Sequence, residues 1–299
     1  MDTKLSQIDF PYRFSIIGAG KVAKSLADKL QDLSLLDFVV YRKSNRQMEL
    51  INFGINSNFI TNQLQNVVKS DIIIISVNDN SITEIVDKIE KIINNSTKIK
   101  FIFHTSGLIS PKILLPLADK GINLFSAHPV QTFFFPSKSL LRNITWGIET
   151  IKTDKSEITR IIELLDGKAF FLPDHLVENR ALYHLLCVVS SNFLTTTIEF
   201  AKLIGNHLEI EDITFLSELI KTTSDNCIRN LNKVDTPLTG PLARKDFQAI
   251  ENYLDKINDD AALKDILKYY LLANIDIMKE KGIFDKSEAI KNKNTIEKY

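Results

Sequence analysis

Cysteine is scarce in this 299-residue chain, which contains only Cys187 and Cys227. The two lie far apart and show no CxxC spacing, so the sequence indicates neither a disulfide framework nor a cysteine-based zinc site. Charge of one sign is not in excess either, since Lys and Arg number 37, as do Asp and Glu. A net charge of zero argues against a broad basic surface for nucleic acid. We therefore predict no nucleic-acid partner and no bound metal.

Long hydrophobic runs are also missing. The most apolar short run, Ile72–Val77, is far shorter than the roughly 20 residues that a membrane-spanning helix needs. The longer stretch Leu182–Ile198 contains His184 and several Ser, Asn and Thr residues, which is more typical of a buried helix. The chain has no apolar core of a targeting signal before Phe14. We expect a cytoplasmic protein without a membrane partner.

The chain length and the order of its elements predict two domains. At about 150 residues per domain, the length suggests two. Up to Pro173, short apolar strands alternate with amphipathic helices, which indicates an α/β fold with a doubly wound, mostly parallel sheet. Beyond Pro173 the pattern is all-α, including one long helix that ends at Gly205, and the stretch from Lys286 is expected to fray. We predict an α/β domain over residues 1–173 and an all-helical domain over residues 174–299.

A glycine motif follows the first predicted strand. Residues Gly18 to Ala23 fit the GxGxxA dinucleotide fingerprint. Gly18 permits the tight turn, Gly20 lets the backbone approach a pyrophosphate, and the helix starting at Lys21 and Val22 presents free N–H groups to it. The motif lies between an apolar strand and an amphipathic helix, which is the required context. We predict a dinucleotide site; the alternative is a tight strand–helix turn without a ligand.

The end of the second predicted strand bears on the choice of cofactor. An NAD site carries an Asp or Glu there to bind the ribose hydroxyls. In this chain Asp37 precedes Phe38 and so lies at the wrong end of that strand. Arg42, Lys43 and Ser44 follow the strand instead, and they suit a 2′-phosphate. The sequence therefore favours NADP as the cofactor, the alternative being a solvated basic turn.

Polar residues also follow the third predicted strand. Val77, Asn78 and Asp79 come where ligands bind in parallel sheets, beyond the carboxyl end of the strand. We assign them to the ribose or nicotinamide side of the cofactor. The alternative is that Asp79 or Asn80 caps the next helix, and the two interpretations can coexist.

Two histidines end further strands on the same side. His104 opens the segment His-Thr-Ser-Gly, and His128 opens His-Pro-Val-Gln-Thr. Histidine can give or take a proton near neutral pH. We predict His104, Ser106 and His128 as catalytic-site residues, with structural hydrogen bonding as the alternative for each histidine.

The sequence resembles a family of Rossmann-like, NADP-oxidoreductase-type proteins whose C-terminal half is known only as a domain of unknown function. The resemblance is carried by GAGKVA, SVNDNSI, HTSG, HPVQTF, YHLLCVVSSN and LTGPLARKD. It implies an N-terminal NADP domain and a helical C-terminal domain like that of 6-phosphogluconate dehydrogenase. The chain is more distantly similar to hydroxyisobutyrate dehydrogenases, pyrroline-carboxylate reductase and prephenate dehydrogenase. Related folds dimerise through their helical domains, so the resemblance implies a homodimer.

The first helix of the second half departs from the related hydroxyacid dehydrogenases, which carry a lysine and an asparagine one turn apart. No lysine lies between Leu176 and Phe200. His184 is the candidate proton donor here, and Ser191 and Asn192 follow about two turns later on one face. We therefore add His184 and Asn192 to the catalytic residues and Ser191 to substrate binding. The alternative is a satisfied interior cluster.

Arg244, in the segment LTGPLARKD, is the last candidate residue. Its guanidinium could clamp a substrate carboxylate or phosphate, the alternative being a surface salt bridge. The motifs GxSxG, HExxH and GxxxxGK[ST] are absent. The leading hypothesis is an NADP(H)-dependent oxidoreductase that transfers hydride between the nicotinamide and a carbonyl or imine carbon of a small polar substrate. The alternatives are a non-catalytic NADP-binding sensor and a dimeric scaffold that binds no cofactor.

Overall fold

The computed structural model describes residues 10–94, 97–151, 154–233, 237–257 and 259–298. The chain forms two compact units, Met1–Ser191 and Asn192–Tyr299. The expected lack of a targeting segment concerns a chain start that lies mainly outside the described residues. The domain boundary at residue 173 stays a prediction.

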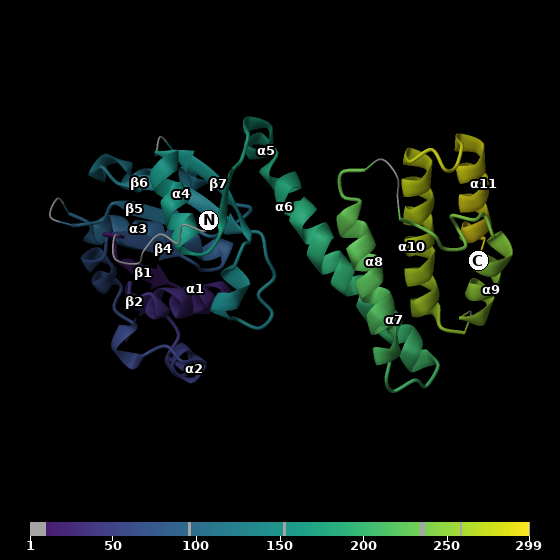
Figure 1. Ribbon diagram of the computed structural model, residues 1–299, viewed down its shortest axis with the longest axis horizontal. Helices are drawn as coiled ribbons and strands as arrows, with labels where there is room; N and C mark the ends of the chain where they lie inside the picture. The colour runs from purple at the N-terminus through teal and green to yellow at the C-terminus, as the bar shows by residue number, and fades with distance from the viewer. Residues whose placement is uncertain (1–9, 95–96, 152–153, 234–236, 258, 299) are drawn as a thin grey trace, which may run out of the picture. The chain divides into compact units, whose positions relative to one another are not determined.

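An eight-stranded sheet organises the first unit (Figure 1). Its strand order is β3-β2-β1-β4-β5-β6-β7-β8; β1 to β6 run parallel, and β7 pairs antiparallel with β6. This order confirms the predicted doubly wound, mostly parallel sheet and puts the switch point between β1 and β4. The strands are β1 Phe14–Ile17, β2 Leu36–Val40, β3 Ile60–Thr61, β4 Ile72–Ile75, β5 Phe101–His104, β6 Asn123–Pro129, β7 Thr145–Ile151 and β8 Lys168–Phe171.

Helices cover both faces of the sheet, and this explains why its central strands are apolar throughout. Every residue of β1, β4 and β5 is buried. On one face α1 and α4 pack in a core that contains Trp146, and on the other α3 packs with the 3-10 segment η5. The helical segments are α1 Lys21–Asp32, α2 Asn45–Phe53, η2 Ser57–Phe59, η3 Leu64–Lys69, η4 Asp79–Ser81, α3 Ile82–Ile92, η5 Pro111–Lys120, η6 Lys138–Leu141, α4 Lys155–Leu164, α5 Asp174–Glu178 and α6 Arg180–Val188.

The second unit is helical in its described part, as predicted. Its segments are α7 Leu194–His207, η8 Thr214–Leu216, α8 Ser217–Arg229, α9 Phe247–Lys256, α10 Ala261–Glu280 and α11 Lys286–Glu297. The expected fraying from Lys286 is wrong. The side chain of Asp285 accepts from the backbone N–H of Glu288, whose side chain in turn accepts from the backbone N–H of Asp285. Ile296 is buried near the helix end and joins the core of this unit, so α11 is capped and packed.

The single long helix expected after Pro173 is interrupted twice. Asn179, with φ −107° and ψ 40°, separates α5 from α6. A π-helical segment, Val189–Phe193, then follows α6. There the hydroxyls of Ser190 and Ser191 donate to the carbonyls of Leu186 and Cys187, four residues back, at 2.8 and 2.7 Å. Such bonds compete with the backbone ladder and distort helices.

By length and composition alone, the helical stretch Arg180–His207 could cross a membrane. A core helix passes the same test, but only 6% of the apolar window of this stretch is buried. The expectation of a buried helix is therefore wrong. An apolar composition predicts that a helix surface will be buried, but it does not show whether the chain's own core or another molecule buries it.

Candidate functional site

The first part of the candidate site is the glycine turn between β1 and α1. Gly18 has φ +134°, and a Cβ there would lie 2.0 Å from the carbonyl oxygen of Ser76, beyond β4. The Gly18 N–H donates to the carbonyl of Val40 at 2.9 Å, so the turn links the carboxyl ends of three strands. Only glycine tolerates this backbone conformation and this close approach.

Gly20 shows where this turn is open. Within the described residues, apart from the chain next to Gly20, no atom lies within 4 Å of a Cβ placed on it, and the start of α1 has no side-chain cap. The first N–H groups of a helix need a partner, and an anion is a suitable one. Ala23, one turn on, is fully buried, so the helix packs closely on the sheet as the motif requires. A dinucleotide pyrophosphate therefore fits this turn.

Three of the other predicted cofactor residues line the same turn. Lys21 is exposed, and its Nζ lies 4.7 Å from the ring centroid of Phe134. Val22 packs against the core beneath, and Val77 Cγ1 lies 3.5 Å from a Cβ placed on Gly18. These positions agree with a role beside the cofactor, although that role stays a prediction.

Asn78 and Asp79 form a short 3-10 turn after β4. Asn78 is the N-cap residue of η4 but makes no side-chain cap bond, and Ser81, not Asp79 or Asn80, is the N-cap of α3. The capping alternative is therefore wrong. The contact of Asn78 and Asp79 with the cofactor stays a prediction.

The predicted basic turn lies at the carboxyl end of β2. Arg42, Lys43 and Ser44 are all exposed. Arg42 Nη1 lies 3.3 Å from Glu84 Oε2, a long contact between two exposed side chains that contributes little. Asp37 is at the other end of β2, as the sequence predicts. There it accepts from Arg13 Nε at 2.5 Å. No acid therefore takes the place of the basic residues at the carboxyl end of β2.

The two strand-end histidines have different environments. His104 is fully buried, and neither ring nitrogen makes a well-formed hydrogen bond to any described residue. Burial, with a smaller effect of the Arg180 charge, lowers the pKa of His104 to about 4. Ser106 accepts from the N–H groups of Leu108 and Ile109 and closes the turn after β5. His104 and Ser106 are therefore both buried at the carboxyl end of β5.

His128 forms a pair with Tyr183 of α6. Nδ1 of His128 lies 3.1 Å from the Tyr183 hydroxyl, and the ring of His184 lies 6.0 Å away, centroid to centroid. Burial, His184 and Arg180 together lower the pKa of His128 to about 4. Burial, with the neighbouring Cys187, raises the pKa of Tyr183 to about 12. At neutral pH both partners are therefore uncharged, and the pair can relay a proton through its hydrogen bond.

Tyr183 itself, and Arg180 and Glu149 beside the pair, are not among the residues predicted from the sequence. Tyr183 stands in the YHLLC segment beside the predicted His184, so its position was visible but its partner was not. Arg180 and Glu149 form a buried ion pair. Arg180 stands one turn before the predicted His184 in the sequence, but its burial and its partner are visible only in the structure.

The structure describes each of the remaining predicted residues within its own segment. Ser191 lies in the π-helical segment and donates to Cys187. Asn192 begins the second unit, which also contains Arg244. Arg244 is exposed and donates to the carbonyl of Thr239 at 2.8 Å, within its own loop. The roles of Ser191, Asn192 and Arg244 stay predictions.

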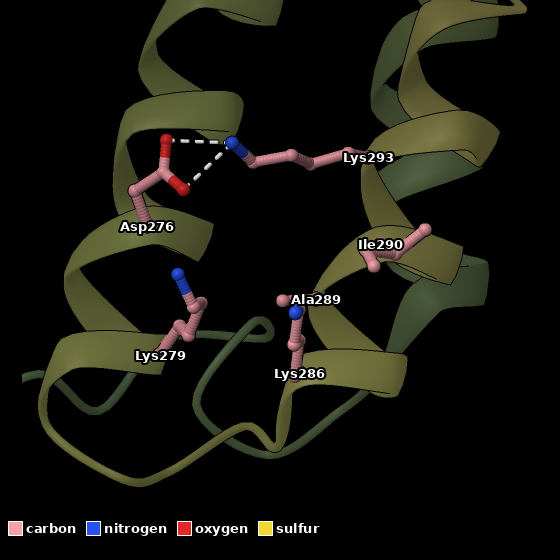
Figure 2. Close-up of a pocket in the computed structure, with 6 residues that line it drawn as sticks. All are labelled: Asp276, Lys279, Lys286, Ala289, Ile290 and Lys293. Carbon is pink, nitrogen blue, oxygen red and sulfur yellow. Dashed lines mark hydrogen bonds and ion pairs between the residues drawn. The ribbon is translucent and has the colours of Figure 1, made fainter.

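A pocket in the second unit lies between α10 and α11 (Figure 2). Its charged lining is mainly basic, and Lys293 pairs with Asp276 at 2.6 Å. Its lining residues include no histidine, cysteine or hydroxyl group that would suit proton transfer. Among the described residues no cluster of His, Cys, Asp and Glu could hold a metal ion. The pocket is lined by Asp276, Lys279, Lys286, Ala289, Ile290 and Lys293.

Comparison with known protein families gives two matches, one in each part of the chain. Residues 4–129 match the Rossmann-like domain, and residues 144–274 match the domain of unknown function DUF2520. A search of curated proteins gives no match.

Solved structures share the fold at low sequence identity. A provisionally assigned NADP oxidoreductase from Bacteroides fragilis is 23% identical with a TM-score of 0.69, over 87% of this chain and 96% of that one. A protein from Thermotoga maritima is 20% identical with a TM-score of 0.64, over 86% and 97%. A reductive aminase from Aspergillus terreus, in complex with NADPH and ethyl-5-oxohexanoate, is 12% identical with a TM-score of 0.58, over 97% and 93%.

Proposed function

We propose that this chain, which combines a Rossmann-like domain with a DUF2520 domain, is an NADP(H)-dependent oxidoreductase. The open glycine turn is the observation that carries the proposal. Gly18 is held at a positive φ between three strand ends, while Gly20 leaves the start of α1 uncovered. This arrangement suits a pyrophosphate, and the similar fold of a reductive aminase that binds NADPH supports a nicotinamide cofactor.

The basic turn after β2 supports NADP over NAD. Arg42, Lys43 and Ser44 offer two positive charges and a hydroxyl, all exposed, where an NAD site would carry an acid. A guanidinium binds a phosphate through two parallel hydrogen bonds. In this proposal Arg42 and Lys43 bind the 2′-phosphate, and Asn78 and Asp79 lie nearer the nicotinamide.

The cofactor, when bound, supplies hydride exchange with a carbonyl or imine carbon of a small polar substrate. The chain supplies the proton through its own groups. Tyr183 and His128 are hydrogen-bonded and neutral at pH 7, so the pair can deliver a proton to the substrate oxygen or nitrogen or take one from it. His184 lies beside the pair and offers a second exchangeable proton.

Three further predicted residues belong to the substrate part of the proposal. We propose that Asn192 orients the substrate, with Ser191 from the adjoining π-helical segment, and that Arg244 anchors a substrate anion. Arg244 already uses one nitrogen on its own loop, which leaves the rest of its fork exposed for a carboxylate or phosphate.

A homodimer in the cytoplasm belongs to the same proposal. On α6, Leu182, Leu185 and Leu186 are all exposed, and contiguous apolar surface of this kind is typical of an interface. The stretch also carries His184, Ser190 and Ser191, polar groups that suit a protein interface better than lipid.

A sensor without turnover is the alternative, and the complete burial of His104 favours it, because a buried histidine cannot meet a substrate. The two functions are separated by incubating the protein with NADPH and a panel of small aldehydes, ketones and cyclic imines. The oxidoreductase oxidises NADPH in a substrate-dependent way, and Tyr183→Phe slows this at least tenfold without a matching loss of NADPH affinity. Tight NADPH binding with no oxidation across the panel would favour the sensor.

A further inference from the structure

A buried arginine ties α6 to the carboxyl edge of the sheet. Arg180 is the first residue of α6 and is only 6% exposed. Its Nη2 donates to the Ser126 hydroxyl on β6 at 2.7 Å, and its Nε donates to the carbonyl of Gly107 after β5 at 3.2 Å. Its Nη1 pairs with Glu149 on β7. One side chain thus joins the helix to three neighbouring strands or their ends.

Glu149 completes this cluster. It is 8% exposed, and its second oxygen accepts from the Ser110 hydroxyl at 2.7 Å. The ion pair is therefore buried and has additional partners on both sides. Buried ion pairs contribute little net stability compared with apolar packing, because desolvation offsets their attraction. Their orientation is nevertheless strict, since a guanidinium binds only in the plane of its fork.

The start of α6 is not fixed by a side-chain cap. Asn179 precedes the helix with a non-helical backbone and makes no side-chain cap bond to it. Tyr183 lies three residues after Arg180, on the same face of the helix. The direction of Arg180 therefore decides where the Tyr183 hydroxyl lies relative to His128.

We propose that Arg180, held by Glu149, is a positioning residue that sets the Tyr183 hydroxyl against His128. The importance of this pair for proton transfer rests on the proposed function; the geometric role of Arg180 does not. The glycines around the pair show how closely the fit is made. A Cβ at Gly147 would lie 2.1 Å from the Tyr183 hydroxyl, and one at Gly107 would lie 2.9 Å from the His128 ring.

The charge of Arg180 has a second consequence for His128. The groups that bear on this ring are Tyr183, His184 and Arg180, all from α6, while Glu149 is occupied by Arg180 and Ser110. Burial is the largest cause of the low pKa of His128, and the positive charge of Arg180 adds to it. Removing that charge should move the pKa of His128 upward.

The test compares Arg180→Lys and Arg180→Met in the full chain without cofactor. The matched control is Arg160→Met on the surface of α4, where Arg160 pairs with its neighbour Glu157. Histidine ring signals are followed by NMR across pH, with the His128 signal assigned through His128→Gln, and the ring nitrogen shifts report its hydrogen bond. NADPH affinity is measured by calorimetry for each variant.

Lysine keeps the charge but cannot bind three partners in one plane. We expect Arg180→Lys to leave the pKa of His128 low while removing the ring-nitrogen signature of the bond to Tyr183. Arg180→Met should lose the signature and raise the pKa of His128, by less than burial and His184 lower it. If Arg180→Met does not fold, Glu149→Gln, which keeps Arg180 but releases it from the ion pair, should weaken the same signature.

An unchanged His128 signature in Arg180→Lys would overturn the proposal, because the hydrogen bond would then form without the arginine fork. NADPH affinity within about twofold of wild type in all variants is the expected companion result, since Arg180 contacts β6, β7 and the turn after β5 and not the glycine turn. Failure of the wild-type protein to bind NADPH would count against the proposed function but would leave the NMR result on Arg180 intact.

Discussion

The hydroxyl of Tyr183 lies 3.1 Å from Nδ1 of His128, and a glycine makes room for each ring. Gly107 faces the imidazole and Gly147 faces the phenol hydroxyl. The sheet edge and α6 are therefore shaped around a single neutral hydrogen-bonded pair.

The Gly147→Ala variant tests how closely this fit is made. The new methyl group would lie 2.1 Å from the Tyr183 hydroxyl, so the ring must move or the fold must strain. We expect a loss of about 1–3 kcal/mol in the free energy of unfolding, measured by urea denaturation. Gly240→Ala, whose Cβ meets no described atom within 4 Å, is the control and should be close to neutral.

A double variant separates this overlap from a general effect on β7. Tyr183→Phe removes the overlapping oxygen, so Gly147→Ala should cost less in that background than in wild type. Equal costs in the two backgrounds would show that Gly147 matters for a reason other than Tyr183.

The two glycines of the turn before α1 should behave differently when each is changed to alanine. Gly18→Ala combines a left-handed backbone with an overlap on the carbonyl of Ser76, and we expect it to destabilise the fold by roughly 3 kcal/mol or more. Gly20→Ala meets open space, so the fold should remain stable while affinity for NADPH falls at least tenfold. Denaturation and calorimetry on the same samples measure both effects. Unchanged NADPH affinity in Gly20→Ala would contradict a pyrophosphate at this turn.

Stability should fall as the pH drops below neutral. His104 has a pKa of about 4 in the folded chain against 6.5 when unfolded, so between these values the unfolded state binds more protons. The stability that neutral His104 contributes is complete above pH 6.5 and is lost as the pH falls toward 4. Proton binding by His104 alone should lower the free energy of unfolding by about 2 kcal/mol at pH 5 relative to pH 7.

Urea denaturation at pH 7 and pH 5 measures this dependence, and His104→Gln is the informative comparison. The variant should be less stable at pH 7 but should lose less stability on acidification than wild type. His175→Gln, a change at an exposed histidine, is the matched control. An identical pH dependence in wild type and His104→Gln would refute the assignment to His104.

Self-association through α6 is the fourth expectation. Sedimentation equilibrium should give twice the 34.0 kDa chain mass. Leu186→Glu places a charge on a side chain that is 63% exposed and should shift the protein to monomer, whereas Met48→Glu on α2, 57% exposed, should not. A monomeric wild-type protein would rule out the homodimer.

Local sequence patterns predicted the features that depend on a few neighbouring residues. The place of Asp37 at the amino end of β2 follows from counting along one strand, and the Gly18 turn follows from a motif with a fixed backbone requirement. The expected fraying after Lys286 was wrong because composition suggested disorder while the cap at Asp285 and the burial of Ile296 anchor the helix.

The Tyr183–His128 and Arg180–Glu149 pairs could not be predicted from one sequence. Each joins α6 to a strand far away in the chain, and no periodicity encodes which strand that is. The sequence did suggest that His184 lies in a site, but it could not show that the neighbouring Tyr183 makes the hydrogen bond.

The central claim is that the glycine turn binds a dinucleotide whose extra phosphate is held by Arg42 and Lys43. Calorimetric titration of the full chain with NADPH and with NADH tests it most directly. We predict at least tenfold tighter binding of NADPH, and we expect Arg42→Ala/Lys43→Ala to abolish this preference while the control Lys100→Ala/Arg160→Ala keeps it. Equal affinity for the two nucleotides would contradict the NADP assignment, and binding of neither would contradict the cofactor site itself.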